Sequence, residues 1–175
     1  MGRLDEWRFC PRCGEPIEVE ERHATCAHCG FEEYGNSAPA TEALVLRDGR
    51  VLLSRRGIEP HKGKWDLPGG FLEEAEHPLD GVRRELREET GLEIEVHRFL
   101  RAGVERYGRQ DVLILSWLAS APDGEPEATD DVAELAWLAP DELPAPEEFA
   151  FAHHARLLAD WAGGTLLPKD EPNGP

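Results

Sequence analysis

Hydrophobic and polar positions between residues 40 and 162 show two periodicities, one typical of strands and one typical of helices. The segments ATEALVL (40–46) and RVLLSRR (50–56) are predicted to form two strands, and Asp48-Gly49 between them is a two-residue hairpin signal. Further extended segments are predicted at 64–72, 93–107, 111–120 and 134–139. The first of these is broken by the run Pro68-Gly69-Gly70, and an acidic, proline-bearing loop fills 121–131.

Two helices are predicted in the same region. The first covers roughly Pro78–Thr90, because proline suits a first helical position and Gly91 suits the stop. The last covers 146–162. Strands on both sides of a central helix, with another helix at the end, indicate an α/β protein: an α/β/α sandwich around a mixed sheet.

Turn residues cluster in YGNSAP (34–39), just before the first strand, and mark a boundary. We therefore expect a small N-terminal module at 1–36, a main domain at 38–162 and a disordered tail at 163–175. A chain of 175 residues holds one core of ordinary size plus such an appendage.

The net charge of the chain limits the classes of molecule that we expect it to bind. Lys and Arg number 19 against 36 Asp and Glu, which gives a net charge of −17. Such acidity argues against nonspecific binding to nucleic acid or anionic membranes, although metal ions can still bridge the chain to a phosphorylated small molecule. No apolar run approaches the roughly 20 residues that cross a bilayer, and the N-terminus lacks an apolar signal core. We expect a cytoplasmic protein.

The N-terminal module contains two C-x2-C pairs separated by twelve residues, and a glycine follows each pair, at Gly14 and Gly30. Two thiolate pairs with this spacing suit one tetrahedral zinc ion, and the glycines let the backbone turn around the sulfurs. The predicted ligands are Cys10, Cys13, Cys26 and Cys29. Four thiolates leave no position for a catalytic water, so this zinc is expected to be structural. The alternative of two disulfides is disfavoured in a cytosolic chain, and His23 and His28 are expected at the surface.

The predicted helix at 78–90 carries an unusual arrangement of charge. At about 100° per residue, its apolar residues gather on one side and its glutamates Glu85, Glu88 and Glu89 gather in the neighbouring sector. The apolar residues are Leu79, Val82 and Leu86. Three carboxylates this close repel one another unless a cation lies between them, and Mg²⁺ prefers such oxygen ligands. The alternative is a solvated face with i,i+4 pairs, but the preceding glycine turn favours a metal site.

The same segment resembles the signature of the Nudix hydrolases. That family carries glycine, five residues, glutamate, seven residues, then Arg-Glu-apolar-any-Glu-Glu-any-Gly-apolar. All nine positions match, at Gly70, Glu76, Arg84, Glu85, Leu86, Glu88, Glu89, Gly91 and Leu92. The resemblance implies metal-dependent cleavage of a nucleoside diphosphate linked to another moiety.

The resemblance also implies roles for the matching residues. The three glutamates and the Gly70 carbonyl would bind Mg²⁺ or Mn²⁺, Arg84 would pair with a glutamate and hold it in register, and Glu76 would support the turn. Glu85 or Glu88 would take the proton from the attacking water. Family members differ in this base, so later acidic residues stay open alternatives: Asp130, Asp131 and Glu134.

The sequence indicates the substrate less clearly than it indicates the family. A four-cysteine ribbon before a Nudix domain resembles two groups. The NADH pyrophosphatases carry a Ser-Gln-Pro-Trp-Pro-Phe-Pro element after the signature, and nothing after Leu92 resembles it. The other group includes pyrophosphatases acting on ADP-ribose and FAD, and the layout of the whole chain is more similar to it. The resemblance implies a homodimer. A Nudix domain that senses a nucleotide without cleaving it stays an alternative, which the intact glutamates disfavour.

Several residues are candidates for substrate contact. Trp65, Tyr107 and Phe151 can stack on a base or flavin, although each also suits a hydrophobic core. Basic residues near the signature can meet phosphates, or form a solvated patch; they are Arg55, Arg56, Lys62 and Lys64.

Overall fold

The structure, a computed structural model, describes residues 2–166. The chain forms two compact units. One comprises Met1–Ala38 with Val104–Leu113, and the other comprises Pro39–Gly103 with the chain from Ile114 onward. Most of the segment for which we predicted disorder, from residue 167 to 175, lies outside the described residues.

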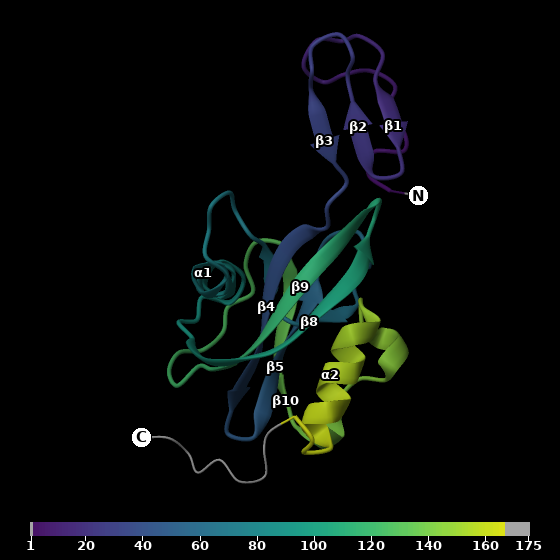
Figure 1. Ribbon diagram of the computed structural model, residues 1–175. Helices are drawn as coiled ribbons and strands as arrows, with labels where there is room; N and C mark the ends of the chain where they lie inside the picture. The colour runs from purple at the N-terminus through teal and green to yellow at the C-terminus, as the bar shows by residue number, and fades with distance from the viewer. Residues whose placement is uncertain (1, 167–175) are drawn as a thin grey trace. The chain divides into compact units, whose positions relative to one another are not determined.

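The first unit contains a three-stranded antiparallel sheet in the order β1-β2-β3 (Figure 1). Its strands are β1 (Glu18–Glu20), β2 (His23–Thr25) and β3 (Glu32–Tyr34). They are short, as expected for a module with little apolar sequence. The small core draws on two of the cysteines and comprises Leu4, Cys10, Ile17, Ala24 and Cys26.

The second unit is built on a seven-stranded sheet whose main path runs β10-β5-β4-β9-β8; the end of the β8–β9 hairpin, Val104–Leu113, is grouped with the first unit. Two short strands extend it: β6 pairs with β5, and β7 pairs with β4. The bounds are β4 (Ala38–Arg47), β5 (Arg50–Arg56), β6 (Trp65–Asp66), β7 (Gly69–Phe71), β8 (Glu95–Tyr107), β9 (Gln110–Ser120) and β10 (Val132–Leu138). In Figure 1, β4 and β9 run in the same direction, whereas β4 is antiparallel to β5, so the sheet is mixed.

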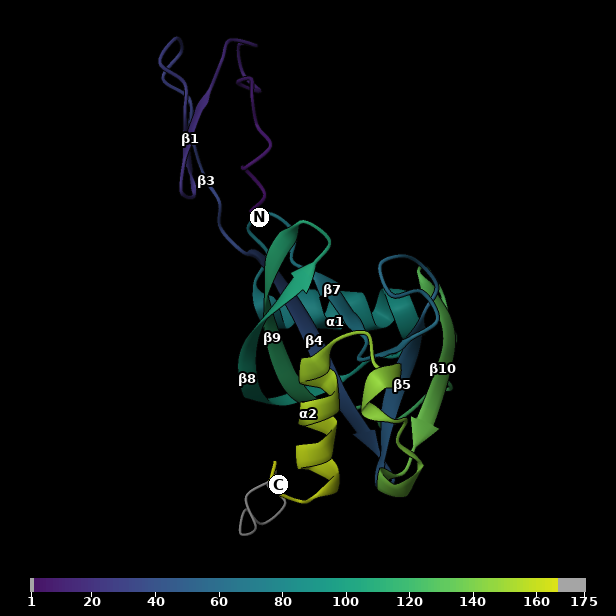
Figure 2. The same cartoon turned by 90° about the vertical axis from the view of Figure 1, so that its right-hand side faces the viewer.

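Two helices cover opposite faces of this sheet, α1 (Pro78–Thr90) and α2 (Ala152–Ala162) (Figure 2). Successive residues of β4 point to opposite faces of the sheet, so this strand contributes to a hydrophobic core on each face. Ala43 and Val45 pack with α1 residues Val82 and Leu86. Leu44, between them in sequence, packs with Leu157 and Leu158 of α2. This is the predicted α/β/α sandwich, and it leaves β4 buried on both faces.

The first predicted helix is confirmed in its bounds. Gly91 ends it in the left-handed region, with φ of 70°, and its N–H donates to the Arg87 carbonyl. The hairpin at Asp48-Gly49 is confirmed as well, since β4 ends at Arg47 and β5 begins at Arg50. Of the apolar stripe predicted on α1, Val82 and Leu86 are fully buried, whereas Leu79 is half-buried.

The predicted start of the last helix is wrong. A 3₁₀ turn, η2 (Pro146–Glu148), is followed by extended chain, and α2 begins only at Ala152. Phe149 is buried and forms a parallel bridge with Trp65, and the Ala150 N–H donates to the Trp65 carbonyl. A second 3₁₀ turn, η1 (Pro140–Glu142), precedes it. Within residues 2–166, no helix has the length and apolar character needed to cross a bilayer.

Candidate active site and metal centres

The glycine turn before α1 is fixed by close contacts with β4 and α1. Gly69 pairs with Glu42 and Gly70 with Thr41. Gly69 has φ of 152°, and a Cβ there would lie 2.3 Å from the Thr41 carbonyl oxygen. A Cβ at Gly70 would lie 2.5 Å from Glu85 Oε2. Gly69 therefore requires glycine, whereas at Gly70 a Cβ would push the Glu85 carboxylate aside, so this glycine lets the backbone lie against an α1 carboxylate.

Arg84 organises the acidic residues around this turn. Its guanidinium donates to both carboxylate oxygens of Glu76, each at 2.8 Å, and to the Phe71 carbonyl at 3.1 Å. Its Nη1 donates to Glu85 at 2.9 Å and to Glu88 at 3.0 Å. The hydrogen bonds from Arg84 hold the pKa of Glu76 down at about 2. One planar cation thus links the turn residue to two glutamates of α1, as its fork of donors allows.

Glu89 is buried. It accepts a hydrogen bond from the Gly69 N–H at 2.9 Å. Burial raises the pKa of Glu89 well above its usual range, and the neighbouring carboxylates Asp131, Asp66 and Glu85 raise it further. Burial likewise raises the pKa of Glu85, in spite of Arg84. These two carboxylates are where added positive charge would be most stabilising.

The loop between β9 and β10 reaches the end of α1. The Thr129 N–H donates to the Glu89 carbonyl at 3.2 Å, and its hydroxyl donates to the Glu88 carbonyl. This places Asp131 near enough to raise the pKa of Glu89. The sequence left Asp130 and Asp131 open as bases, and the fold brings their loop to the helix that carries the three glutamates.

The predicted substrate contacts separate into groups. Arg55 donates to Glu134 at 2.8 Å, and its guanidinium carbon lies 4.3 Å from the Trp65 ring centroid, so these three lie together. Arg56 instead donates to Asp66 at 2.7 Å in a nearly buried pair. Tyr107 belongs to the other unit, in the segment Val104–Leu113.

The remaining candidates lie elsewhere. The Phe151 ring lies 5.7 Å from the Arg56 guanidinium and is buried, and Lys64 donates to the Glu147 carbonyl at 3.1 Å. Lys62 is exposed.

The four cysteines converge in the first unit. Cys10 Sγ lies 3.6 Å from Cys29 Sγ, and Cys13 Sγ lies 3.7 Å from Cys26 Sγ. These separations exclude disulfides, whose sulfurs lie about 2.05 Å apart, and the thiols are free. All four sulfurs lie within 4.8 Å of one another. For a tetrahedral ion with metal–sulfur bonds of about 2.3 Å, neighbouring sulfurs are about 3.8 Å apart, so the cluster has the right size.

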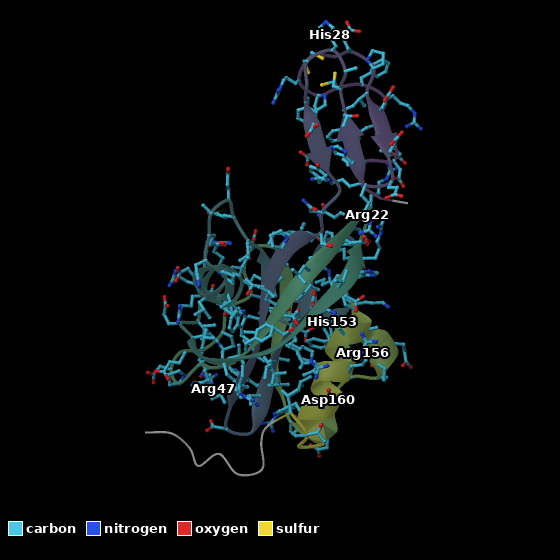
Figure 3. All side chains as sticks on the ribbon, viewed as in Figure 1. Arg22, His28, Arg47, His153, Arg156 and Asp160 are labelled. Atoms are coloured by element: carbon cyan, nitrogen blue, oxygen red, sulfur yellow. The ribbon has the colours of Figure 1, made fainter. Side chains whose placement is uncertain are left out.

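The two cysteine turns are built alike. The Gly14 N–H donates to the Cys10 carbonyl and the Gly30 N–H to the Cys26 carbonyl, both at 2.9 Å. Both glycines have positive φ, 79° and 67°, as the sequence predicted. His28 is exposed (Figure 3), and His23 is partly buried and stacks on Tyr34 at 4.3 Å.

A third group was missed by the sequence reasoning. Glu42, His153 and His154 lie together and are buried, and each offers a ligand atom within 4.8 Å of the others. The signal that would have found them is a glutamate inside an apolar strand and a His pair inside a predicted apolar helix.

Comparison with known proteins identifies the family. Residues 37–161 match the NUDIX domain. The chain is 34% identical over 137 residues to a MutT-like protein of Streptomyces ambofaciens, covering 77% of this chain and 84% of the relative. It is 32% identical over 133 residues to an ADP-ribose pyrophosphatase of Methanocaldococcus jannaschii, covering 75% and 76%.

A further relative is longer than this chain. The chain is 31% identical over 154 residues to the NAD-capped RNA hydrolase NudC of Pseudomonas aeruginosa; the match covers 84% of this chain and 53% of NudC, so it spans about half that protein. Among solved structures, a NUDIX hydrolase from Nitrosomonas europaea superimposes with a TM-score of 0.75 at 23% identity, covering 90% of this chain and 94% of the other, which shows a shared fold.

Proposed function

The chain belongs to the Nudix hydrolase family, and on that premise we propose that it hydrolyses the diphosphate linkage of a nucleoside diphosphate joined to a second moiety. ADP-ribose and FAD are the proposed substrates. The observation that carries the proposal is the group of carboxylates at the glycine turn, where buried Glu89 and part-buried Glu85 face acidic neighbours.

The donor set fits a hard divalent cation. We propose that Glu85, Glu88 and Glu89 supply carboxylate oxygens to this ion together with the Gly70 carbonyl, because oxygen ligands of this kind suit Mg²⁺ or Mn²⁺; Glu85 already lies against Gly70. When bound, such an ion neutralises the diphosphate and the charge that develops during its cleavage. Arg84 holds Glu85 and Glu88 side by side and ties them to Glu76. Arg84 therefore serves to position the carboxylates, and Glu85 or Glu88 is proposed to accept the proton of the attacking water.

The substrate class rests on charge and on relatives. One relative is named for ADP-ribose and another for NAD-capped RNA. A net charge of −17 opposes an RNA backbone, so a small nucleotide is the better ligand. Arg55 is proposed to offer a cation for it, whereas Trp65, whose ring lies under the Arg55 guanidinium, is buried in the hydrophobic core.

The four-cysteine cluster is proposed to hold one structural zinc. Its four thiols supply a closed tetrahedral set, and soft thiolates favour zinc over magnesium. The small core around Cys10 and Cys26 contains few other large apolar side chains, so metal binding is expected to contribute most of the stability of this unit.

A substrate panel tests the proposal. The full chain is incubated with Mg²⁺ and, separately, ADP-ribose, FAD, NADH, NAD-capped RNA and 8-oxo-dGTP, and product release is followed by chromatography. We expect the highest kcat/KM for ADP-ribose or FAD. Binding without product from any member would support the sensor alternative, and preference for 8-oxo-dGTP would move the enzyme to the nucleoside triphosphate class.

A further inference from the structure

A buried cluster on the α2 face of the sheet contains three metal-ligating side chains that the proposed hydrolysis does not use. Glu42 belongs to β4, and His153 and His154 lie in the first turn of α2, where Figure 3 labels His153. His154 Nε2 lies 2.7 Å from Glu42 Oε2, and His153 Nε2 lies 3.2 Å from both Glu42 oxygens. All three side chains are at most 6% exposed.

The donor atoms form a set with a defined chemistry. Two imidazole nitrogens and one carboxylate are a common protein ligand set for zinc and related cations. The hard Mg²⁺ prefers oxygen ligands and suits this set less well. The cluster therefore differs in kind from the glutamates of α1, which offer oxygen only, and from the four thiols of the other unit.

The surroundings orient these ligands in the way that metal sites require. His154 Nδ1 lies 2.9 Å from Asp66 Oδ1, so a carboxylate lies behind the ring whose Nε2 contacts Glu42. The Ser116 hydroxyl donates to Glu42 Oε1 at 2.7 Å. A carboxylate behind a ligating histidine and a hydrogen bond to a ligating carboxylate are typical outer-shell partners of a bound metal.

The buried charges around Glu42 have to be balanced by a cation. Arg56 pairs with Asp66 at 2.7 Å, so the negative charge of Glu42 is the one left to compensate. A buried carboxylate is stable only beside positive charge, and either a proton on a histidine or a metal ion can supply it.

The spacing of the donor atoms is compatible with one shared ion. His154 Nε2 lies 2.7 Å and His153 Nε2 lies 3.2 Å from oxygens of Glu42, separations that suit ordinary N–H···O hydrogen bonds and also lie close to those of neighbouring ligands bound at about 2.0–2.1 Å to one metal ion. A shared cation accounts for both rings. We propose that Glu42, His153 and His154 bind one zinc-like transition-metal cation in a second metal site that joins the start of α2 to β4. This inference is independent of the substrate and of hydrolysis.

Metal counting on the full chain tests the proposal. The protein is produced with Zn²⁺, passed through gel filtration in excess Mg²⁺ to keep the glutamates of α1 occupied, and analysed for zinc by mass spectrometry. We expect two zinc ions per chain, one for the four cysteines and one for the new site. Glu42→Gln and His153→Gln should each hold one. His97→Gln, an exposed histidine on β8, is the matched control and should hold two.

A cobalt titration makes the result independent of variant folding. Thiolate-bound Co²⁺ gives charge-transfer bands, whereas Co²⁺ on imidazole and carboxylate gives only d–d bands. In the metal-depleted wild type we expect one equivalent of each kind. A single zinc per wild-type chain with the cysteines filled, or two zinc ions retained in His153→Gln, would overturn the proposal and leave a proton as the cation of this cluster.

Discussion

Replacing Gly70 by alanine tests whether the Glu85 carboxylate must lie where the structure places it. The added Cβ would lie 2.5 Å from Glu85 Oε2 and 2.6 Å from Cδ. Ordinary contact begins at 3.4 Å, so the oxygen has to retreat by about 0.9 Å. Because a displacement of about 1 Å in an active site costs roughly 100-fold in rate, we expect kcat/KM to fall by about that factor.

The fold should tolerate the same change. The clashing atoms belong to the end of a flexible side chain, and Gly70 lacks the positive φ of Gly69. The displaced Glu85 loses its charge-assisted hydrogen bond from Arg84, which costs about 1.5–3 kcal/mol. Alanine restricts the unfolded chain and returns about 0.4–1 kcal/mol. The net loss of about 0.5–2.6 kcal/mol should lower Tm by roughly 1–10 °C without unfolding the protein at the assay temperature.

Two further glycines serve as comparisons in the same assay, which measures kcat/KM over a Mg²⁺ titration and Tm for each variant. Gly103→Ala meets no atom within 4 Å and should match the wild type in both. Gly69→Ala would drive its Cβ into the backbone of Thr41 and should lose stability. If Gly70→Ala folds and turns over like the wild type, Glu85 is not needed in its present position.

Three other predictions concern the two units. Glu88→Gln keeps the shape of a half-exposed side chain, so the protein should fold while turnover falls by at least about 100-fold; steady-state kinetics at saturating Mg²⁺ checks this, with exposed Glu93→Gln as the unaffected control. Mild EDTA should abolish hydrolysis while the thiolate cluster keeps its zinc, and Mg²⁺ or Mn²⁺ alone should restore it; loss of zinc in step with activity would contradict the division of roles. The double variant Cys26→Ser, Cys29→Ser should lose the order of the N-terminal unit before it loses the chemical step. Turnover per folded molecule decides this, and a drop as large as that of Glu88→Gln would place the ribbon in the active site.

Local signals carried the sequence predictions that succeeded. Helix α1 was bounded correctly because Pro78 and Gly91 act within a residue or two of themselves. The cysteine cluster was foreseeable because two short turns hold all four ligands. The family was foreseeable because the nine fixed positions of the signature all lie in one glycine turn and the helix that follows it.

The predictions that failed concern residues whose contacts join segments far apart in the sequence. The start of α2 was misplaced because Phe149 pairs with Trp65, more than eighty residues earlier. Arg56 was a candidate for phosphate contact, but it lies in a nearly buried pair with Asp66. The pairing of Glu42 with His154 joins residues 112 positions apart. The sequence offers only its separate halves, a glutamate in an apolar strand and a His pair in an apolar helix, and not their contact.

Adjacent residues of strand β4 point to opposite faces of the sheet and make different contacts there. Thr41 accepts a hydrogen bond from the Trp117 indole at 2.9 Å, and its hydroxyl lies 3.4 Å from the Pro78 carbonyl at the start of α1. The next residue, Glu42, serves the cluster at α2. Since a shift of one residue exchanges the faces of a strand, point substitutions here can accumulate one at a time during evolution. Insertion or deletion of a single residue cannot, because it would reverse both faces together, so the length of this strand should be tightly constrained.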